Sequence, residues 1–247
     1  MKNMILAVSA VSAVSAVAAS ASAGFQGFVA SVRTSGAYTI MDIFAGVSNS
    51  SDKFLNVYDA NISTTVSGGF FQASGLANKT WKPDSANFNS TRSSIDSFMT
   101  AGTFSGGAYG GQYYASTNTN ADPNFTGTTW NATPASQAVT SVPPNAGWYT
   151  GDPTSADNNA ESLAGLTGRV NGTNGQFATH GIWIAHLVLS GAGREIGTDV
   201  SFAGFASIKD GISGALSQGS SNFAAVPAPG ALALLGLAGF AARRRRA

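Results

Sequence analysis

The chain has 247 residues, of which 10% are charged, against about 25% in an average soluble protein. Lys2 and the four arginines at 243–246 lie at the ends. Between the ends, eight basic and twelve acidic residues give a net charge of −4, which argues against nucleic acid as a partner. Cysteine is absent, which excludes disulfide bonds and thiolate chemistry.

Residues 1–23 have the pattern of a secretory signal peptide. Lys2 supplies the positive charge, an apolar run begins at Met4, and Ala21-Ser22-Ala23 before Gly24 forms a small-residue cleavage site. Most of the segment consists of Ala and Ser, with Val between them, and these residues provide no large side chains for packing as a buried helix. It predicts a signal helix that signal peptidase removes after Ala23, and therefore export.

The middle of the chain, residues 24–222, is predicted to form one all-β domain, an antiparallel β-sandwich with long loops. The runs 25–33 and 37–47, with Ser35-Gly36 between them, predict a hairpin whose second strand is apolar on both faces. Further strands are expected at 53–63, 69–73, 95–101, 112–116, 179–190 and 199–209. The last run alternates most regularly, with one face formed by Val200, Phe202, Gly204, Ala206 and Ile208.

Residues 102–175 are rich in turn-forming residues and are predicted to be mostly loop, the region where a ligand is expected to bind. The part at 151–161 gathers oxygen ligands that suit Ca²⁺, but it lacks the spacing of an EF-hand, and a solvated polar turn fits it better. No other cofactor and no metal site is predicted.

Aromatic residues in this region are candidates for ligand binding. Trp130, Trp148 and Tyr149 stand among loop-forming residues and suit a platform for a sugar ring, although core packing accounts for such residues equally well. Trp183, in an apolar run, is predicted to lie in the core.

No catalytic motif is present, so the protein is predicted not to be an enzyme. GxSxG, P-loop and HExxH patterns are missing. His180 and His186 are expected on one face of a strand, about 20 Å apart, too far to share a metal. A pair of carboxylates such as Glu161 and Glu195 leaves a secreted hydrolase open as an alternative.

The C-terminal tail, residues 223–247, resembles a short membrane anchor. Residues 230–242 are apolar throughout and reach about 20 Å as a helix, less than the ~30 Å hydrocarbon core. The basic run Arg243, Arg244, Arg245 and Arg246 follows at once and should stay cytoplasmic, which places the domain outside. We therefore expect a temporary transmembrane helix.

The motif Val226, Pro227, Ala228, Pro229, followed by the apolar span and the arginines, resembles the PEP-CTERM sorting signal. In that family the tail is recognised by an exosortase, a membrane-embedded processing enzyme. Ala228 stands where Glu is usual. The resemblance covers residues 226–247, and it implies transient anchoring followed by a cell-surface or extracellular location.

Residues 55–60 and 143–149 resemble uncharacterised β-rich domains, cohesin-like in shape, that accompany such tails. This resemblance implies a fold and no activity. Together, the patterns predict an exported, non-catalytic protein, structural or adhesive in a surface or polysaccharide matrix. A carbohydrate-binding module that uses the loop aromatics is the first alternative, and a secreted hydrolase is the second.

Overall fold

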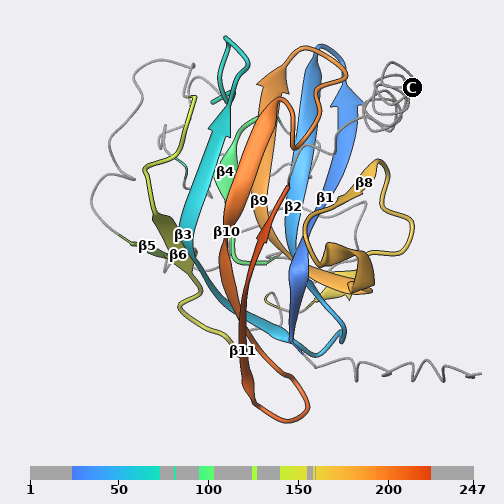
Figure 1. Cartoon of the computed structure of the whole chain (residues 1–247), viewed down its shortest axis with the longest axis vertical. Coiled ribbons are helices and arrows are strands. Elements are labelled where there is room, and N and C mark those ends of the chain that lie inside the picture. The colour runs from blue at the N-terminus through green and yellow to red at the C-terminus, as the bar shows by residue number, and fades with distance from the viewer. Residues whose placement is uncertain are drawn as a thin grey trace, which may run out of the picture.

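The computed structural model describes residues 24–72, 81, 95–102, 124–126, 140–154, 158 and 160–223, which form two antiparallel sheets (Figure 1). Sheet A has the strand order β4 (Phe98–Met99), β9 (His180–Ser190), β2 (Tyr38–Val47), β1 (Phe25–Ser35) and β8 (Arg169–Asn171), and β7 (Glu161–Ser162) also pairs with β9. Sheet B has the order β11 (Leu216–Asn222), β10 (Val200–Lys209), β3 (Lys53–Thr64), β6 (Ala146–Tyr149) and β5 (Asn124–Phe125). The 3-10 turn η3 (Gly175–Phe177) lies beside β1.

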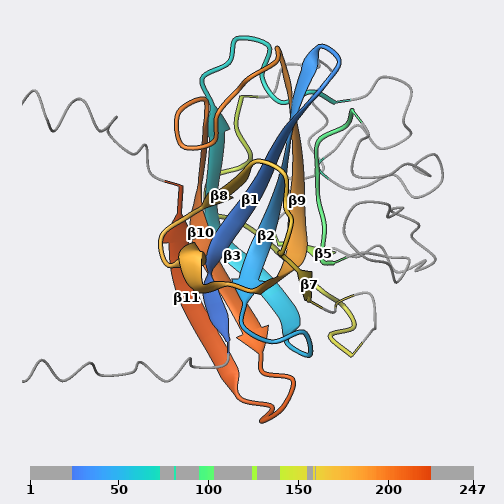
Figure 2. The ribbon, with the colours of Figure 1, turned by 90° about the vertical axis from the view of Figure 1, so that its right-hand side faces the viewer.

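The two sheets stack face to face around a shared apolar core, which confirms the predicted all-β fold of antiparallel strands (Figure 2). Phe28 of sheet A and Phe202 of sheet B meet edge to face, with ring centroids 5.0 Å apart. Among the residues that the structure describes, no helix is long and apolar enough to cross a membrane. The predicted signal helix and the predicted anchor helix fall outside those residues.

Sheet A is buried on both faces. The predicted hairpin is confirmed as β1 and β2, which turn at Gly36 with φ of 58°, and every residue of β2 after Tyr38 is buried. A second apolar cluster covers the face turned away from sheet B, and it consists of Val29, Phe44, Phe98, Leu163, Leu166, Ala178 and Trp183. The prediction that the second hairpin strand is central therefore holds.

The predicted strands at 53–63, 179–190 and 199–209 correspond to β3, β9 and β10. The run 95–101 contains only β4, the run 69–73 contributes a single bridge from Phe70 to Leu189, and 112–116 falls outside the described residues. The prediction that 102–175 is mostly loop missed four short strands, β5 to β8. No strand was predicted at β11 either, because its Ser, Gln, Gly and Asn residues have low strand propensity and are held extended by pairing with β10.

The first and last strands join the two sheets along one edge of the sandwich. Ser217 Oγ accepts the Phe25 N–H at 3.2 Å, and Ser221 Oγ accepts the Phe28 N–H at 2.9 Å. Ser221 Oγ also donates to the Thr173 carbonyl at 2.8 Å. Phe223, the first residue of the predicted tail, is 5% exposed, and its N–H donates to the Phe202 carbonyl at 3.1 Å, so this residue packs with the sandwich.

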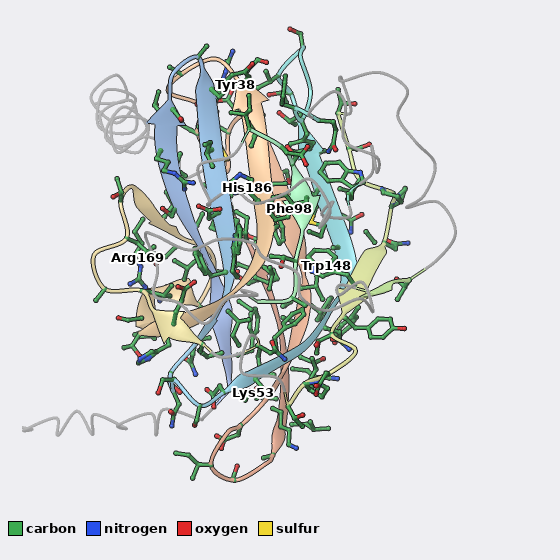
Figure 3. All side chains as sticks on the ribbon, turned by 180° about the vertical axis from the view of Figure 1, so that it is seen from behind. Tyr38, Lys53, Phe98, Trp148, Arg169 and His186 are labelled. Carbon is green, nitrogen blue, oxygen red and sulfur yellow. The ribbon has the colours of Figure 1, made fainter. Side chains whose placement is uncertain are left out.

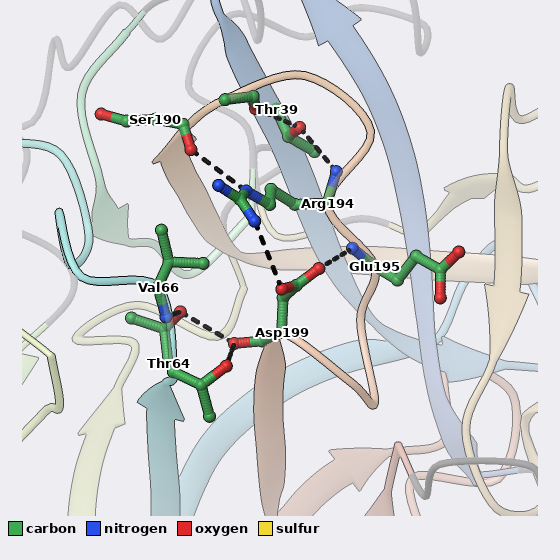
Figure 4. A network of polar contacts seen from close by, with 9 residues as sticks. Thr39, Thr64, Val66, Ser190, Arg194, Glu195 and Asp199 are labelled. Atoms are coloured by element: carbon green, nitrogen blue, oxygen red, sulfur yellow. Dashed lines mark hydrogen bonds and ion pairs between the residues drawn. The ribbon is translucent and has the colours of Figure 1, made fainter.

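The loop at 191–199 carries the chain from sheet A to sheet B and is fixed by a polar network (Figure 4). Arg194 lies 3.7 Å from the Asp199 carboxylate, and the Arg194 N–H donates to Thr39 Oγ1 at 3.1 Å. The other carboxylate oxygen of Asp199 accepts the Glu195 N–H at 2.9 Å. The backbone carbonyl of Asp199 accepts a hydrogen bond from Thr64 Oγ1 at 2.8 Å. Strands of both sheets are thus bonded to one short loop.

Replacing Ser221 with Ala should destabilise the fold, because the buried Phe28 N–H then loses its acceptor. A buried donor without a partner costs about 1–3 kcal/mol, which urea unfolding would detect as a lower midpoint. Ser220→Ala is the matched control, since Ser220 is exposed on the other face of β11, and its effect should stay within about 0.5 kcal/mol. Equal effects from the two substitutions would contradict this role for Ser221.

Candidate functional site

The outer face of sheet B, turned away from the core, carries polar and aromatic side chains and faces the viewer in Figure 1. Cross-strand pairing places Gln218, Ser207, Asn56 and Tyr149 side by side across β11, β10, β3 and β6. We call these four residues the polar row. Alternation explains why they point outward, since their neighbours Ala206, Ile208, Val57 and Trp148 belong to the core.

Two side chains of the polar row hold buried polar atoms that lack partners. Ser207 is 3% exposed and Asn56 is partly buried. Neither Ser207 Oγ nor Asn56 Oδ1 has a hydrogen-bond partner among the described residues. Because buried polar atoms are nearly always hydrogen-bonded in folded proteins, this pair is an exception that calls for a cause.

Aromatic rings flank these atoms. Tyr149 stands directly opposite Asn56 and is 42% exposed. Tyr58 and Phe205 occupy the neighbouring row and stack across β3 and β10, with ring centroids 5.2 Å apart and an interplanar angle of 18°. Aromatic faces next to amide and hydroxyl groups are a combination that suits carbohydrate.

On the other side of the polar row, Lys53 and Lys209 lie opposite each other, next to Leu216, which is 70% exposed. The row itself carries no charge. Along the strands, the outer face of sheet B therefore carries the two lysines, then the uncharged polar row, and then the Tyr58–Phe205 pair.

The structure places two of the three residues considered for an aromatic platform. Trp148 lies in β6, is 0% exposed and donates from Nε1 to the Thr100 carbonyl at 3.0 Å, so of the two interpretations that the sequence left open, core packing applies to it. Consecutive strand residues point to opposite faces, so the burial of Trp148 turns Tyr149 outward. Trp130 lies outside the described residues, and Trp183, 1% exposed, is in the core as predicted.

A buried ionic cluster lies on the outer face of sheet A. Asp42 is 0% exposed and accepts hydrogen bonds from His186 Nδ1, at 2.6 Å, and from the Arg33 guanidinium. Figure 3 shows His186 next to Phe98, and their rings stack with centroids 5.0 Å apart. His186 is itself 0% exposed, and this burial favours a structural role over contact with a substrate.

The two histidines do not share a face of β9, contrary to the prediction. A β-bulge shifts the register between the pairs Ile43–Ala185 and Phe44–Trp183. It turns His186 to the outer face of sheet A with Asp42, whereas His180 pairs with Val47, a core residue of the inner face. One extra residue in the strand reverses the alternation that the sequence predicts.

The glutamates proposed for a hydrolase lie at opposite ends of β9. Glu161 pairs beside Gly181, and Glu195 lies in the loop that follows Ser190. The strand between these points spans about 30 Å, which is far beyond the separation of two carboxylates that cleave a glycosidic bond, about 5–10 Å. Glu161 and Glu195 therefore cannot act as such a pair.

Two aspartates meet where the turn after β2 contacts the β10–β11 turn. Asp52 is buried and accepts the Gly211 N–H at 3.1 Å, and burial is the main cause that raises its pKa above 3.8. Asp210 accepts N–H groups of Ser213 and Ile212 at 2.6 and 2.8 Å, and these bonds lower its pKa. The pKa values of these two neighbouring carboxyl groups are therefore shifted in opposite directions.

The loop considered for Ca²⁺ is partly described. Asp152 Oδ1 accepts both the N–H and the hydroxyl of Thr154, at 2.9 and 2.6 Å, as in a polar turn. Asn158 points into the domain and donates to the Phe54 carbonyl at 2.6 Å. Within the described part of the chain, no group of three or more His, Asp or Glu residues is arranged to hold a metal ion.

Sequence reasoning missed Asn56 and Ser207. The regular alternation at 199–209 was the available signal for Ser207, because it placed Val200 to Ile208 in the core and left the odd-numbered residues outside. No such signal existed for Asn56, because a register shift in β3 separates it from the simple alternation of that strand.

Comparison of the chain with protein-family models, with curated proteins and with solved structures finds no match. The candidate site therefore depends on geometry and chemistry alone.

Replacing Asp42 with Ala should destabilise the domain strongly, because His186 and Arg33 then lose a buried acceptor. Removing one partner of a buried ion pair costs about 3–5 kcal/mol, which chemical unfolding would measure. Asp59→Asn serves as the control, because Asp59 is exposed and Asn tolerates its φ of 50°. A loss below about 1 kcal/mol for Asp42→Ala would show that the cluster does not support the fold.

Replacing Asp52 with Asn should raise the urea midpoint at pH 7. The raised pKa means that the folded state binds the proton more tightly, so the charged form opposes folding as pH rises through and above the folded pKa. The gain should disappear below about pH 3.8, where Asp52 is protonated in both states. Asn can still accept the Gly211 N–H.

Replacing Asp210 with Asn should change the urea midpoint in the opposite direction. Its lowered pKa means that the charged form stabilises the fold above pH 3.8, and that this contribution is lost as pH falls through the folded pKa. The substitution should therefore lower the midpoint at pH 7. The same sign of change in both variants would contradict the assignment.

Proposed function

We propose that this protein is an exported, non-catalytic adhesive component of a cell surface or polysaccharide matrix, sorted by its C-terminal tail. Signal peptidase removes residues 1–23. The tail then holds the protein in the membrane for a time, until an exosortase-type enzyme cuts near Pro227 to Pro229. The protein binds its partners through the outer face of sheet B.

The position of the folded domain between the two predicted processing sites carries this proposal. β1 begins at Phe25, two residues after Ala23 of the predicted cleavage site. The last described strand, β11, ends at Asn222, four residues before Val226. Both cuts would therefore leave every described strand intact.

The joined edge of the sandwich supports the same proposal. Phe25 and Phe28 are bonded to Ser217 and Ser221, so the first and last strands are held together without either terminal segment. A domain fixed in this way can lose its signal and its anchor and keep its fold. The outer face of sheet B, with its exposed Tyr149 ring, then provides an adhesive surface.

An intact-mass measurement on fractionated cells tests the proposal. Cells producing the full chain should yield, in the medium or on the surface, a protein that starts at Gly24 and ends near Pro227 to Pro229. A matched variant with Arg243 to Arg246 replaced by Gln should keep its tail and stay unprocessed. Protein in the medium that retains Arg246-Ala247 would rule out the sorting hypothesis.

Carbohydrate binding, the first alternative from the sequence, is supported by the unpartnered polar atoms of Asn56 and Ser207 in the polar row.

A further inference from the structure

The polar row contains the two features that a binding site needs, an exposed ring and unpartnered polar atoms. Ser207 is 3% exposed, yet its Oγ has no hydrogen-bond partner among the described residues. Asn56 Oδ1, on the neighbouring strand β3, is also buried and also lacks a hydrogen-bond partner. Leaving such atoms unpaired costs stability, so a fold that depended only on packing would favour Ala at position 207.

The chemistry of the two atoms points to a ligand that supplies hydrogen-bond donors and acceptors. Ser207 Oγ can donate and accept, and Asn56 Oδ1 accepts. The row carries no charge, so it does not suit a phosphate or a strongly ionic partner. Hydroxyl groups both donate and accept hydrogen bonds, and a polysaccharide carries many of them along an uncharged chain.

The dimensions of the row suit an extended chain. Four strands contribute one residue each, from Gln218 on β11 to Tyr149 on β6, and three spacings of about 4.8 Å give a length of roughly 14 Å. This is enough for a short run of sugar rings. Tyr149, 42% exposed at one end, presents an aromatic surface on which one ring can stack.

We infer that an uncharged polysaccharide binds across the outer face of sheet B, with one sugar ring stacked on Tyr149. Its hydroxyl groups bond to Asn56 Oδ1 and Ser207 Oγ after the side chains that cover these two buried atoms move aside. Gln218 extends the contact onto β11, next to Ser207. This inference rests on the proposed adhesive function and names its ligand class. Lys53 and Lys209 lie outside the polar row and are not needed for the recognition of hydroxyl groups.

Affinity electrophoresis of the full chain, kept soluble in a nonionic detergent without a sugar headgroup, tests this inference. The gels contain laminarin, dextran, galactomannan or hydroxyethyl cellulose, and a further gel contains the polysaccharide from the medium of the producing cells. Retardation is expected in at least one gel. It should persist in a pull-down at about 1 M NaCl, where the screening length is only ~3 Å.

Substitutions on β10 separate binding from folding. Ser207→Ala should weaken binding about tenfold, the equivalent of 1.4 kcal/mol, while leaving the urea midpoint unchanged or higher, because no bond within the described domain is lost. Ser201→Ala is the matched control, since Ser201 is exposed on the same strand and the same face but far from the polar row. It should change neither quantity.

The aromatic contact has its own pair of variants. Tyr149→Ala should reduce binding about tenfold, whereas Phe177→Ala should not, although Phe177 is 69% exposed and lies on η3. No retardation in any gel, binding abolished by salt, or equal binding by Ser207→Ala and Ser201→Ala would each overturn the inference. None of these results would alter the masses of the processed termini, so failure here is distinguishable from failure of the sorting proposal.

Discussion

The structure depends on the apolar interface between its two sheets. Every second residue of β10 enters that interface, and Phe202 contacts both Phe28 and Phe223 there. Because the alternation of a strand is fixed, burial of Ala206 and Ile208 forces Ser207 to the opposite face. The same constraint buries Trp148 and exposes Tyr149. The candidate site is therefore a direct consequence of the core.

The two outer faces of the sandwich differ in what they can do. The outer face of sheet A is covered by a second apolar cluster and holds the buried Asp42–His186 pair, which suits a structural role. The outer face of sheet B retains the exposed ring of Tyr149 and the unpartnered polar atoms of Asn56 and Ser207. The bonds from Ser217 and Ser221 to β1 close one edge, so loss of the terminal segments would leave this face in place.

The sequence predicted the parts of the fold in which local pattern and tertiary packing agree. The hairpin of β1 and β2 and the alternation of β10 are examples, because their apolar residues mark buried faces directly. It failed where pairing decides the outcome: β11 has a weak strand sequence, and a bulge in β9 separates the faces of His180 and His186. Of the site, Tyr149 was predicted, but Asn56 and Ser207 depend on cross-strand register, which a single strand does not encode.

The most direct test of glycan recognition by sheet B is a map of backbone amide chemical shifts as a short oligosaccharide, cut from a retained polysaccharide, is added to the protein. The largest changes are expected at Asn56, Ser207 and Tyr149, with little change in the buried strand β2 of sheet A. Changes centred on the β10–β11 turn near Ile212, or on sheet A, would contradict it.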